Sequence, residues 1–121
     1  MRRAITLIVA SLALTLGLTA CAPAASAPVD VGANTIILDV RTASEFAAGH
    51  LDGANLLDMN AGEVAAAIPS LDPDAEYVVY CKSGNRAGQA VKLMQDAGFS
   101  NVTNLGSLSQ AAGATGIAVV K

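Results

Sequence analysis

Short apolar segments alternate with short helical patterns along most of the chain, and this order constrains the fold more than any other feature. Runs rich in β-branched residues predict strands, and runs with apolar residues at helical spacing predict helices. Strands are predicted at residues 35–40, 54–57, 77–80 and 102–105, and helices at 42–48, 63–68, 86–97 and 108–114, with an apolar tail at 117–120. The alternation predicts an α/β fold: a small, mostly parallel sheet with helices on both faces.

Local signals indicate where several of these elements begin and end. Thr42 and Glu45 match a capping box, which predicts the start of a short helix. Pro69 predicts the end of the helix before it, and Gly98 the end of the helix over 86–97. Residues 49–53 carry turn residues on both sides, so we expect a turn there.

The first 21 residues have the pattern of an export signal. Arg2 and Arg3 precede an apolar run at 4–18, which is shorter than the roughly 20 residues that a membrane-spanning helix needs. Small residues then lead into Cys21, and the sequence Leu-Thr-Ala-Cys resembles the lipobox of bacterial lipoproteins. The resemblance implies that Cys21 becomes the lipidated N-terminus and that two or more acyl chains, palmitate among them, hold it at the membrane. An ordinary signal peptide and a retained anchor remain the alternatives.

The segment after Cys21 is rich in Ala and Pro and has no hydrophobic period, which predicts a short extended tether. The expected organisation is a signal peptide at 1–20, a lipidated cysteine and tether at 21–33, and one domain at 34–121. We therefore expect an exported protein anchored to the bacterial cell envelope, on the outer face of the cell membrane or in the periplasm of a Gram-negative cell.

The charge of the chain excludes two classes of partner. The net charge is −3, and without Arg2 and Arg3 of the leader, five basic residues face ten acidic ones. An acidic domain without a basic run has no electrostatic footprint for nucleic acid. It also has no surface charge that would hold it to anionic lipid, so membrane attachment is expected through the lipid anchor alone.

The sequence also argues against a metal centre. One histidine, His50, and one free cysteine cannot build a zinc site. Met59 and Met94 are too isolated for a copper site. The acidic residues between 72 and 76 lack the spacing of an EF-hand loop and are expected to form a solvated turn. We expect neither a metal nor another cofactor.

The segment that carries chemistry joins the strand over 77–80 to the helix over 86–97, and it reads Cys81-Lys82-Ser83-Gly84-Asn85-Arg86. If Cys21 carries lipid, Cys81 has no disulfide partner in the chain. A lone thiol in an oxidising compartment implies a use, although a small buried apolar residue is the alternative reading. Its position at the carboxyl end of a predicted parallel strand favours a site.

The loop suits an anionic sulfur. Gly84 allows the backbone N–H groups to turn inward as a nest, and the N-terminus of the following helix adds unpaired N–H groups. A thiolate at Cys81 is stabilised there, with Lys82 and Arg86 nearby. Arg86 can also hold an anionic substrate through two parallel hydrogen bonds. The loop therefore supports nucleophilic cysteine chemistry on an oxyanion.

These segments resemble the rhodanese domain over about residues 34 to 120. The resemblance rests on the cysteine loop and on three earlier segments in the family's order and spacing, Leu38-Asp39-Val40-Arg41, Glu45-Phe46 and residues 49–54. A single exported domain of this size looks most like the small phage-shock-protein-E type of rhodanese. The resemblance implies a parallel sheet with helices on both sides, and transfer of sulfur from a donor such as thiosulfate to cyanide or a thiol through a cysteine persulfide.

The resemblance also implies roles for individual residues. Cys81 would be the nucleophile and persulfide carrier, and the backbone of Lys82, Ser83, Gly84, Asn85 and Arg86 would cradle the persulfide sulfur. Lys82 and Arg86 would orient the anionic donor, Asp39 and Arg41 would hold the loop region together, and His50 would be structural. The expected partners are a small anionic sulfur donor and a cyanide or thiol acceptor, which includes protein thiols, and the protein is expected to be a monomer.

Two other functions remain open. One is a non-catalytic, membrane-tethered binding or sensing module with the rhodanese fold. The other is a cysteine phosphatase or arsenate reductase, but related phosphatases have one more residue between Cys and Arg than the four found here, and a tighter loop favours sulfur. Two aromatic residues of the strand, Tyr77 and Tyr80, are expected to pack rather than to act. Beyond the loop, Gly106-Ser107-Leu108 departs from the family's usual Gly-Gly pair, and no tryptophan follows.

Overall fold

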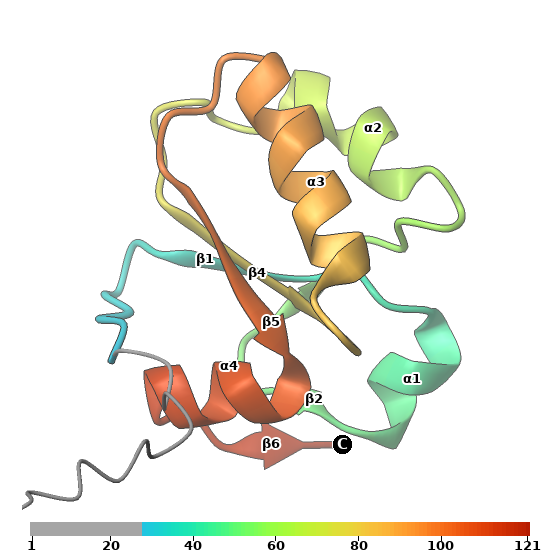
Figure 1. Cartoon of the computed structure of the whole chain (residues 1–121), viewed down its shortest axis with the longest axis vertical. Coiled ribbons are helices and arrows are strands. Elements are labelled where there is room, and N and C mark those ends of the chain that lie inside the picture. Colours follow the sequence, from blue (N-terminus) through green and yellow to red (C-terminus); the bar gives the residue numbers. More distant parts are fainter. Residues whose placement is uncertain (1–27) are drawn as a thin grey trace, which may run out of the picture.

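The computed structural model describes residues 28–121 (Figure 1). The predicted signal peptide, the lipidation site at Cys21 and most of the predicted tether lie outside the described residues. Within the described part of the chain, no helix is both long and apolar enough to cross a membrane.

Strands and helices alternate as the sequence predicts. In chain order the elements are β1 (Ile36–Asp39), α1 (Ala43–Ala48), β2 (His50–Leu51), β3 (Asn55–Leu56), α2 (Glu63–Ala67), the 3-10 turn η1 (Ile68–Ser70), β4 (Tyr77–Cys81), α3 (Asn85–Asp96), β5 (Val102–Ser107), α4 (Leu108–Thr115) and β6 (Val119–Val120). The capping box at the start of α1 is confirmed, since Thr42 accepts a bond from the backbone of Glu45 and Glu45 reaches back to the backbone of Thr42.

The core of the molecule is a four-stranded sheet in the order β3-β1-β4-β5, with every pairing parallel. Helices α2 and α3 lie on one face, and α4 lies on the other with the small β2–β6 pair (Figure 1). This is the α/β architecture that the alternation predicts. Parallel strands require a crossover connection, and the helices supply it while they cover the apolar faces of the sheet.

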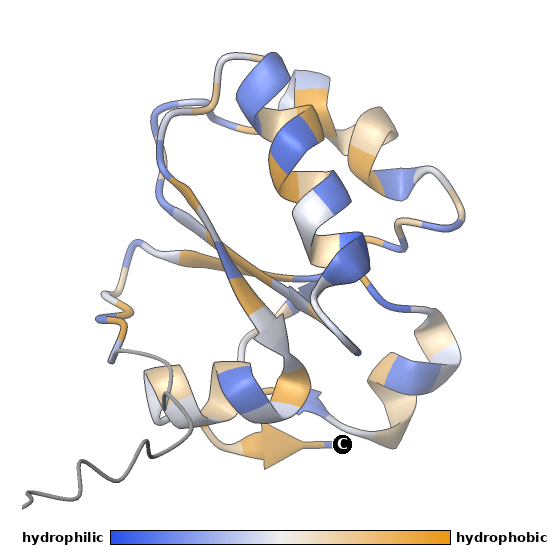
Figure 2. Cartoon of the chain, viewed as in Figure 1, coloured by the Kyte–Doolittle hydropathy of each residue, from blue (hydrophilic) through white to orange (hydrophobic). Residues whose placement is uncertain are grey.

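Strand β4 is buried along its whole length because both of its faces are covered. Successive side chains point to opposite faces of a strand. Tyr77, Val79 and Cys81 therefore pack toward α2 and α3, whereas Val78 and Tyr80 pack toward α4. Figure 2 shows hydrophobic colouring along the central strands, while the helices carry both hydrophobic and hydrophilic residues.

The two tyrosines of β4 are core residues, as predicted, and each has a hydrogen bond that satisfies its hydroxyl group. The hydroxyl of Tyr77 donates to the carbonyl of Asp72 at 2.8 Å. The hydroxyl oxygen of Tyr80 accepts from the backbone N–H of Leu51 at 3.0 Å. Burial of the ring raises the pKa of Tyr80. Neither residue belongs to the cysteine loop.

Two expectations for local structure were wrong. Residues 50 and 51 form strand β2, which pairs antiparallel with β6 in the apolar tail, rather than a simple turn. That pairing joins segments far apart in the chain, so a local pattern could not reveal it. The α-helix over 63–67 ends one residue early, and η1 continues through Pro69. Proline is tolerated there because the first N–H groups of a helical turn need no partner within the turn.

Strand β5 contains an irregularity that shapes the end of the sheet. Its register with β4 shifts by one residue at Leu105, and Gly106 adopts a positive φ of 85°. Ser107 then caps α4, because its side chain accepts a bond from the backbone of Gln110 while the Gln110 side chain accepts one from the backbone of Ser107. Ser107 therefore starts helix α4.

Gly106→Ala is expected to lower the free energy of unfolding by about 2–3 kcal/mol. An alanine here would have a strained backbone because φ is positive, and its Cβ would overlap the Oε1 atom of Gln110 that completes the cap. Chemical denaturation measures this. Gly53→Ala is the matched control, since Gly53 has a similar φ of 83° but no atom within 4 Å of the position that a Cβ would take, and about 1 kcal/mol is expected. Equal losses in the two variants would show that the contact with Gln110 is not the cause.

Candidate active site

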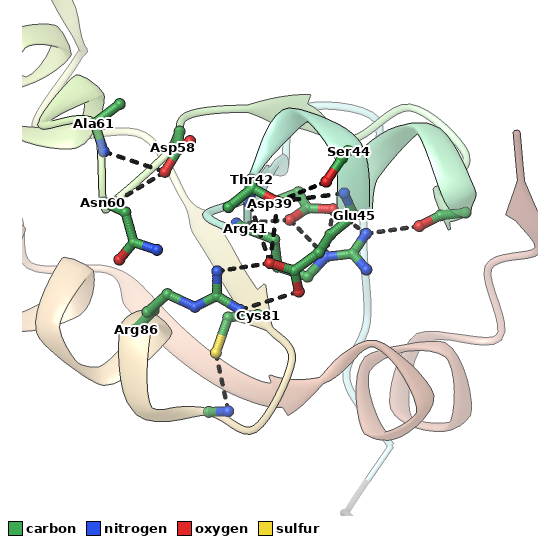
Figure 3. Close-up of polar contacts among 12 residues, drawn as sticks. Asp39, Arg41, Thr42, Ser44, Glu45, Asp58, Asn60, Ala61, Cys81 and Arg86 are labelled. Carbon is green, nitrogen blue, oxygen red and sulfur yellow. Dashed lines mark hydrogen bonds and ion pairs between the residues drawn. The ribbon is translucent and has the colours of Figure 1, made fainter.

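Cys81 ends the most buried strand of the sheet. It lies at the carboxyl end of β4, it is a free thiol, and its residue is fully buried. The backbone N–H of Gly84 donates to its Sγ atom at 2.9 Å (Figure 3). Open parallel sheets form their sites at the carboxyl ends of strands, so the position of Cys81 agrees with the location expected from the sequence.

The loop between β4 and α3 depends on Gly84. This residue has a φ of 95°, which favours glycine, and a Cβ on it would lie 3.3 Å from the Cα atom of Gly106. It is also the N-cap of the 12-residue helix α3, and no side chain caps that end. The first N–H groups of α3 are therefore not satisfied by a capping side chain, and together with the helix dipole they favour an anion.

One N–H group of the predicted nest contacts the sulfur of the free thiol. Among the described residues, the N–H of Gly84 bonds to Sγ, and no such bond is found for Lys82, Ser83, Asn85 or Arg86. The residues Lys82, Ser83 and Asn85 are all exposed. One donor therefore holds the free thiol, and the remaining N–H groups of the loop are available for a further atom attached to it.

Sequence reasoning missed a residue that fixes the loop from β5. The side-chain amide of Asn104 donates to the carbonyl of Gly84 at 3.1 Å, and its oxygen accepts from the backbone N–H of Gly106 at 2.8 Å. Asn104 thus ties the cysteine loop to the irregular end of β5. No local pattern marks such a residue, because its partners become neighbours only when β5 pairs with β4.

The most important contact that sequence reasoning missed is between α1 and α3. The guanidinium of Arg86 donates from Nη1 to Oε1 of Glu45 at 2.9 Å and from Nη2 to Oε2 at 3.1 Å (Figure 3). The side chains are 19% and 27% exposed, so the pair lies at the rim of the site. The hydrogen bond with Arg86 lowers the pKa of Glu45 to about 2, more than partial burial raises it.

This contact occupies part of the guanidinium of Arg86, and its role toward an anionic donor stays a prediction. The sequence predicts that Arg86 orients an anionic donor, but two of its five N–H donors are engaged by Glu45. Lys82, the other predicted anion contact, is exposed. Arg86 is thus held in a fixed orientation by a carboxylate before any substrate arrives.

Asp39 and Arg41 form a buried ion pair, and Arg41 also lies over the ring of Tyr80, the residue before Cys81; that the pair holds the loop region together stays a prediction. The Nη2 atom of Arg41 lies 2.6 Å from Oδ2 of Asp39, and the same atom donates to the carbonyl of Gly49 at 2.6 Å. Asp39 also accepts from the backbone N–H of Arg41 at 3.0 Å. The pair therefore fixes the chain between α1 and β2. The two residues are separated by one position, so the side chains meet locally.

His50 is placed as a structural residue. Its Nδ1 atom lies 2.8 Å from the carbonyl oxygen of Phe46, and its ring stacks on the Phe46 ring with centroids 3.7 Å apart. Because a carbonyl only accepts, this contact assigns the proton to Nδ1. In the described part of the chain, His, Cys, Asp and Glu side chains form no group of three that could hold a metal ion.

An open groove of about 420 Å³ lies beside the loop. It is lined by residues of the loop, of β5 and of α4: Ser83, Gly84, Asn104, Leu105, Gly106 and Gln110. The lining carries amide and hydroxyl groups but no charged side chain. The groove gives a second molecule room to approach the loop next to Gly84, whose N–H contacts the sulfur.

The ion pair at the rim predicts a specific pH dependence of stability. Glu45 has a folded pKa of about 2, below its ordinary value, so the pair stabilises the fold above about pH 4.5 and loses this contribution as the pH falls toward 2. Glu45→Gln is expected to cost about 1 kcal/mol at pH 7 and much less near pH 2, where Glu45 is half protonated. Urea titrations of both proteins across this range measure the difference. Gln can keep the capping box, and a difference that stayed constant down to pH 2 would contradict the assignment.

Comparison with known families and proteins identifies a matching family and similar proteins. The family described as the rhodanese-like domain matches residues 24–112. The probable adenylyltransferase/sulfurtransferase MoeZ of Mycobacterium tuberculosis is 36% identical over 80 residues, which cover 64% of this chain and 20% of MoeZ. The chain thus spans only a fifth of that relative. The thiosulfate sulfurtransferase PspE of Escherichia coli is 32% identical over 98 residues, which cover 79% of this chain and 90% of PspE.

Solved structures show the same fold. The crystal structure of a rhodanese-like domain of Anabaena sp. has a TM-score of 0.62 and 32% identity, and the match covers 72% of this chain and 99% of that one. A rhodanese with anions from E. coli has a TM-score of 0.61 and 27% identity, with 72% and 98% of the two chains covered.

Proposed function

This chain belongs to the rhodanese-like domain family, and from that premise we propose that it is a sulfurtransferase that carries sulfane sulfur as a persulfide on Cys81. The observation that supports this most directly is the environment of the thiol. Cys81 Sγ accepts the N–H of Gly84 beside the uncapped N-terminus of α3. An anionic sulfur at this point meets the N–H of Gly84 and the positive end of a helix dipole.

Thiosulfate is the donor that we propose. The thiolate of Cys81 attacks the outer sulfur of thiosulfate, the S–S bond of the donor breaks, and sulfite leaves with the electron pair. The product is a persulfide anion, and the total charge is unchanged. The unpaired N–H groups of the loop can then receive the terminal sulfur, which extends beyond the position that Gly84 already holds.

The acceptor completes the cycle. Cyanide attacks the terminal sulfur, thiocyanate leaves, and the thiolate of Cys81 is restored with no other reactant. A thiolate acceptor takes the sulfur in the same way and becomes a persulfide itself. The groove beside Gly84 offers access for a thiol carried on a larger molecule, which includes a protein thiol.

The names of the relatives support this choice. PspE of E. coli is described as a thiosulfate sulfurtransferase, and this chain covers 90% of its length. MoeZ is described as a probable sulfurtransferase. The related E. coli rhodanese structure is described as holding anions, which supports an anionic donor at the loop.

The steady-state assay for this proposal supplies thiosulfate and cyanide to the purified protein and follows thiocyanate. Turnover that saturates with thiosulfate is the expected result. Absence of turnover, with a thiol that reacts no faster with iodoacetamide than free cysteine does, would overturn the proposal.

A second candidate is a non-catalytic binding or sensing module that uses the same fold. Two observations favour it: the Cys81 residue is fully buried, and Arg86 is engaged by Glu45 rather than free. This candidate predicts a folded protein without turnover in the thiosulfate assay.

The location of the protein is a separate proposal. We propose that Cys21 is lipidated, that the domain is held at the cell envelope by this anchor, and that it acts there as a monomer. The support is the order of the basic residues, the apolar run and the small residues before Cys21 in the sequence.

A further inference from the structure

The charge of the cation at the rim of the cysteine loop is offset by a carboxylate. Glu45 binds Arg86 through both of its carboxylate oxygens, at 2.9 and 3.1 Å. Glu45 comes from α1 and Arg86 from the first turn of α3, so the contact joins the two helices. Figure 3 shows both bonds between Arg86 and Glu45.

The charged groups around Arg86 can be named. The hydrogen bond with Glu45 raises the pKa of Arg86 most, and the charges of Glu45, Cys81 and Asp58 raise it further. Lys82 is the other cation of the loop, and it is exposed. One carboxylate, that of Glu45, is therefore fixed to the guanidinium by two bonds. The positive charge available to an incoming anion is smaller than the sequence alone suggests.

We propose that Glu45 is a specificity-determining residue that positions Arg86 and makes the site discriminate between sulfur donors by their charge. The carboxylate repels an approaching anion in proportion to the anion's charge. It therefore disfavours doubly charged donors, such as thiosulfate, relative to singly charged donors of the thiosulfonate class. This inference rests on the proposed sulfur transfer at Cys81.

Both donor classes undergo the same chemical step. With thiosulfate, the Cys81 thiolate takes the outer sulfur and sulfite leaves. With methanethiosulfonate, the same attack takes the outer sulfur, the S–S bond breaks, and methanesulfinate leaves with the electron pair. Each step gives the same persulfide and conserves charge. The two donors differ mainly in their leaving group and in carrying two negative charges or one.

The test compares kcat/KM for thiosulfate and for methanethiosulfonate in the wild-type protein and in Glu45→Gln. The ratio of the two constants, thiosulfate over methanethiosulfonate, is expected to rise about threefold to tenfold in Glu45→Gln, mostly through a lower KM for thiosulfate. A loss of Arg86 positioning would lower both constants together, so the ratio isolates the effect of charge. Glu45→Ala serves as a second neutral variant if Glu45→Gln does not fold.

Two further variants separate charge from structure. Glu45→Asp keeps the carboxylate and should keep the wild-type ratio even if kcat falls. Asp74→Asn removes the same charge from the turn before β4, at the opposite end of that strand from Cys81, and should also leave the ratio unchanged.

Three outcomes would count against the inference. An unchanged ratio in Glu45→Gln would overturn it, as would an equal rise in Asp74→Asn or in Glu45→Asp. Failure of the proposed function looks different: the wild-type protein would then turn over neither donor and would gain no sulfur.

Discussion

Cys81→Ser is expected to reduce thiocyanate production from thiosulfate and cyanide by at least about 10³-fold, to the rate without protein. The reason is chemical: a serine hydroxyl is a far weaker nucleophile than a thiolate, and an alkoxide cannot carry a persulfide. Sγ is the atom that accepts the Gly84 N–H, so the substitution changes the atom at the centre of the loop while leaving the backbone in place. Initial rates of thiocyanate formation measure the effect.

The second cysteine provides the matched control for this result. Cys21→Ser removes the other cysteine of the full chain and should retain the wild-type turnover in detergent. The thermal unfolding transition of each variant shows that it is folded. Turnover that survived in Cys81→Ser, or that disappeared in Cys21→Ser, would remove Cys81 from the role of sulfur carrier.

The second large effect is expected for stability rather than for activity. Arg41→Met should lower the free energy of unfolding by about 3–5 kcal/mol, because it leaves the carboxylate of Asp39 buried without its partner. The backbone N–H of Arg41 remains as one donor to Asp39, and the carbonyl of Gly49 loses its guanidinium contact. Urea unfolding at pH 7 measures the loss.

An exposed ion pair in the same protein serves as the control. Lys92 and Asp96 are one turn apart on α3, with side chains 76% and 65% exposed, and Lys92→Met should cost no more than about 0.5 kcal/mol. If Arg41→Met cost as little as Lys92→Met, the buried pair would not be what fixes the segment between α1 and β2.

The parts of the fold that sequence reasoning predicted are those with a local cause. Strand β4 is a continuous apolar run because helices cover both of its faces, and α3 carries an apolar stripe because one side of it packs on the sheet. The capping box of α1 is formed by residues three apart, which the sequence shows directly. The alternation of these elements was enough to predict a parallel sheet with helices on both faces.

The contacts that sequence reasoning missed join segments that are distant in the chain. Strand β2 depends on β6, which follows almost 70 residues later, and two-residue strands carry too little pattern to identify. Glu45 matches a capping box, and that local role gave no reason to assign it a second one with Arg86, 41 residues away. The bond from Asn104 to Gly84 likewise has no local sequence signal, because the two residues become neighbours only when β5 pairs with β4.

In the candidate site, too, the features with a local cause could be predicted and the contacts between distant segments could not. The strand, the glycine and the helix that place Cys81 could be identified from consecutive residues. The charge at the rim of the loop could not, because it depends on a tertiary ion pair. Sequence reasoning therefore placed Cys81 correctly at the end of β4, but it did not show that Glu45 binds Arg86.

The most direct test of Cys81 as the sulfur carrier is the intact mass of the protein after incubation with thiosulfate alone. We expect a gain of about 32 Da, one sulfur atom, that cyanide removes and that Cys81→Ser does not acquire. An unchanged mass in the wild-type protein, or the same gain in Cys81→Ser, would contradict the central claim that Cys81 carries the transferred sulfur.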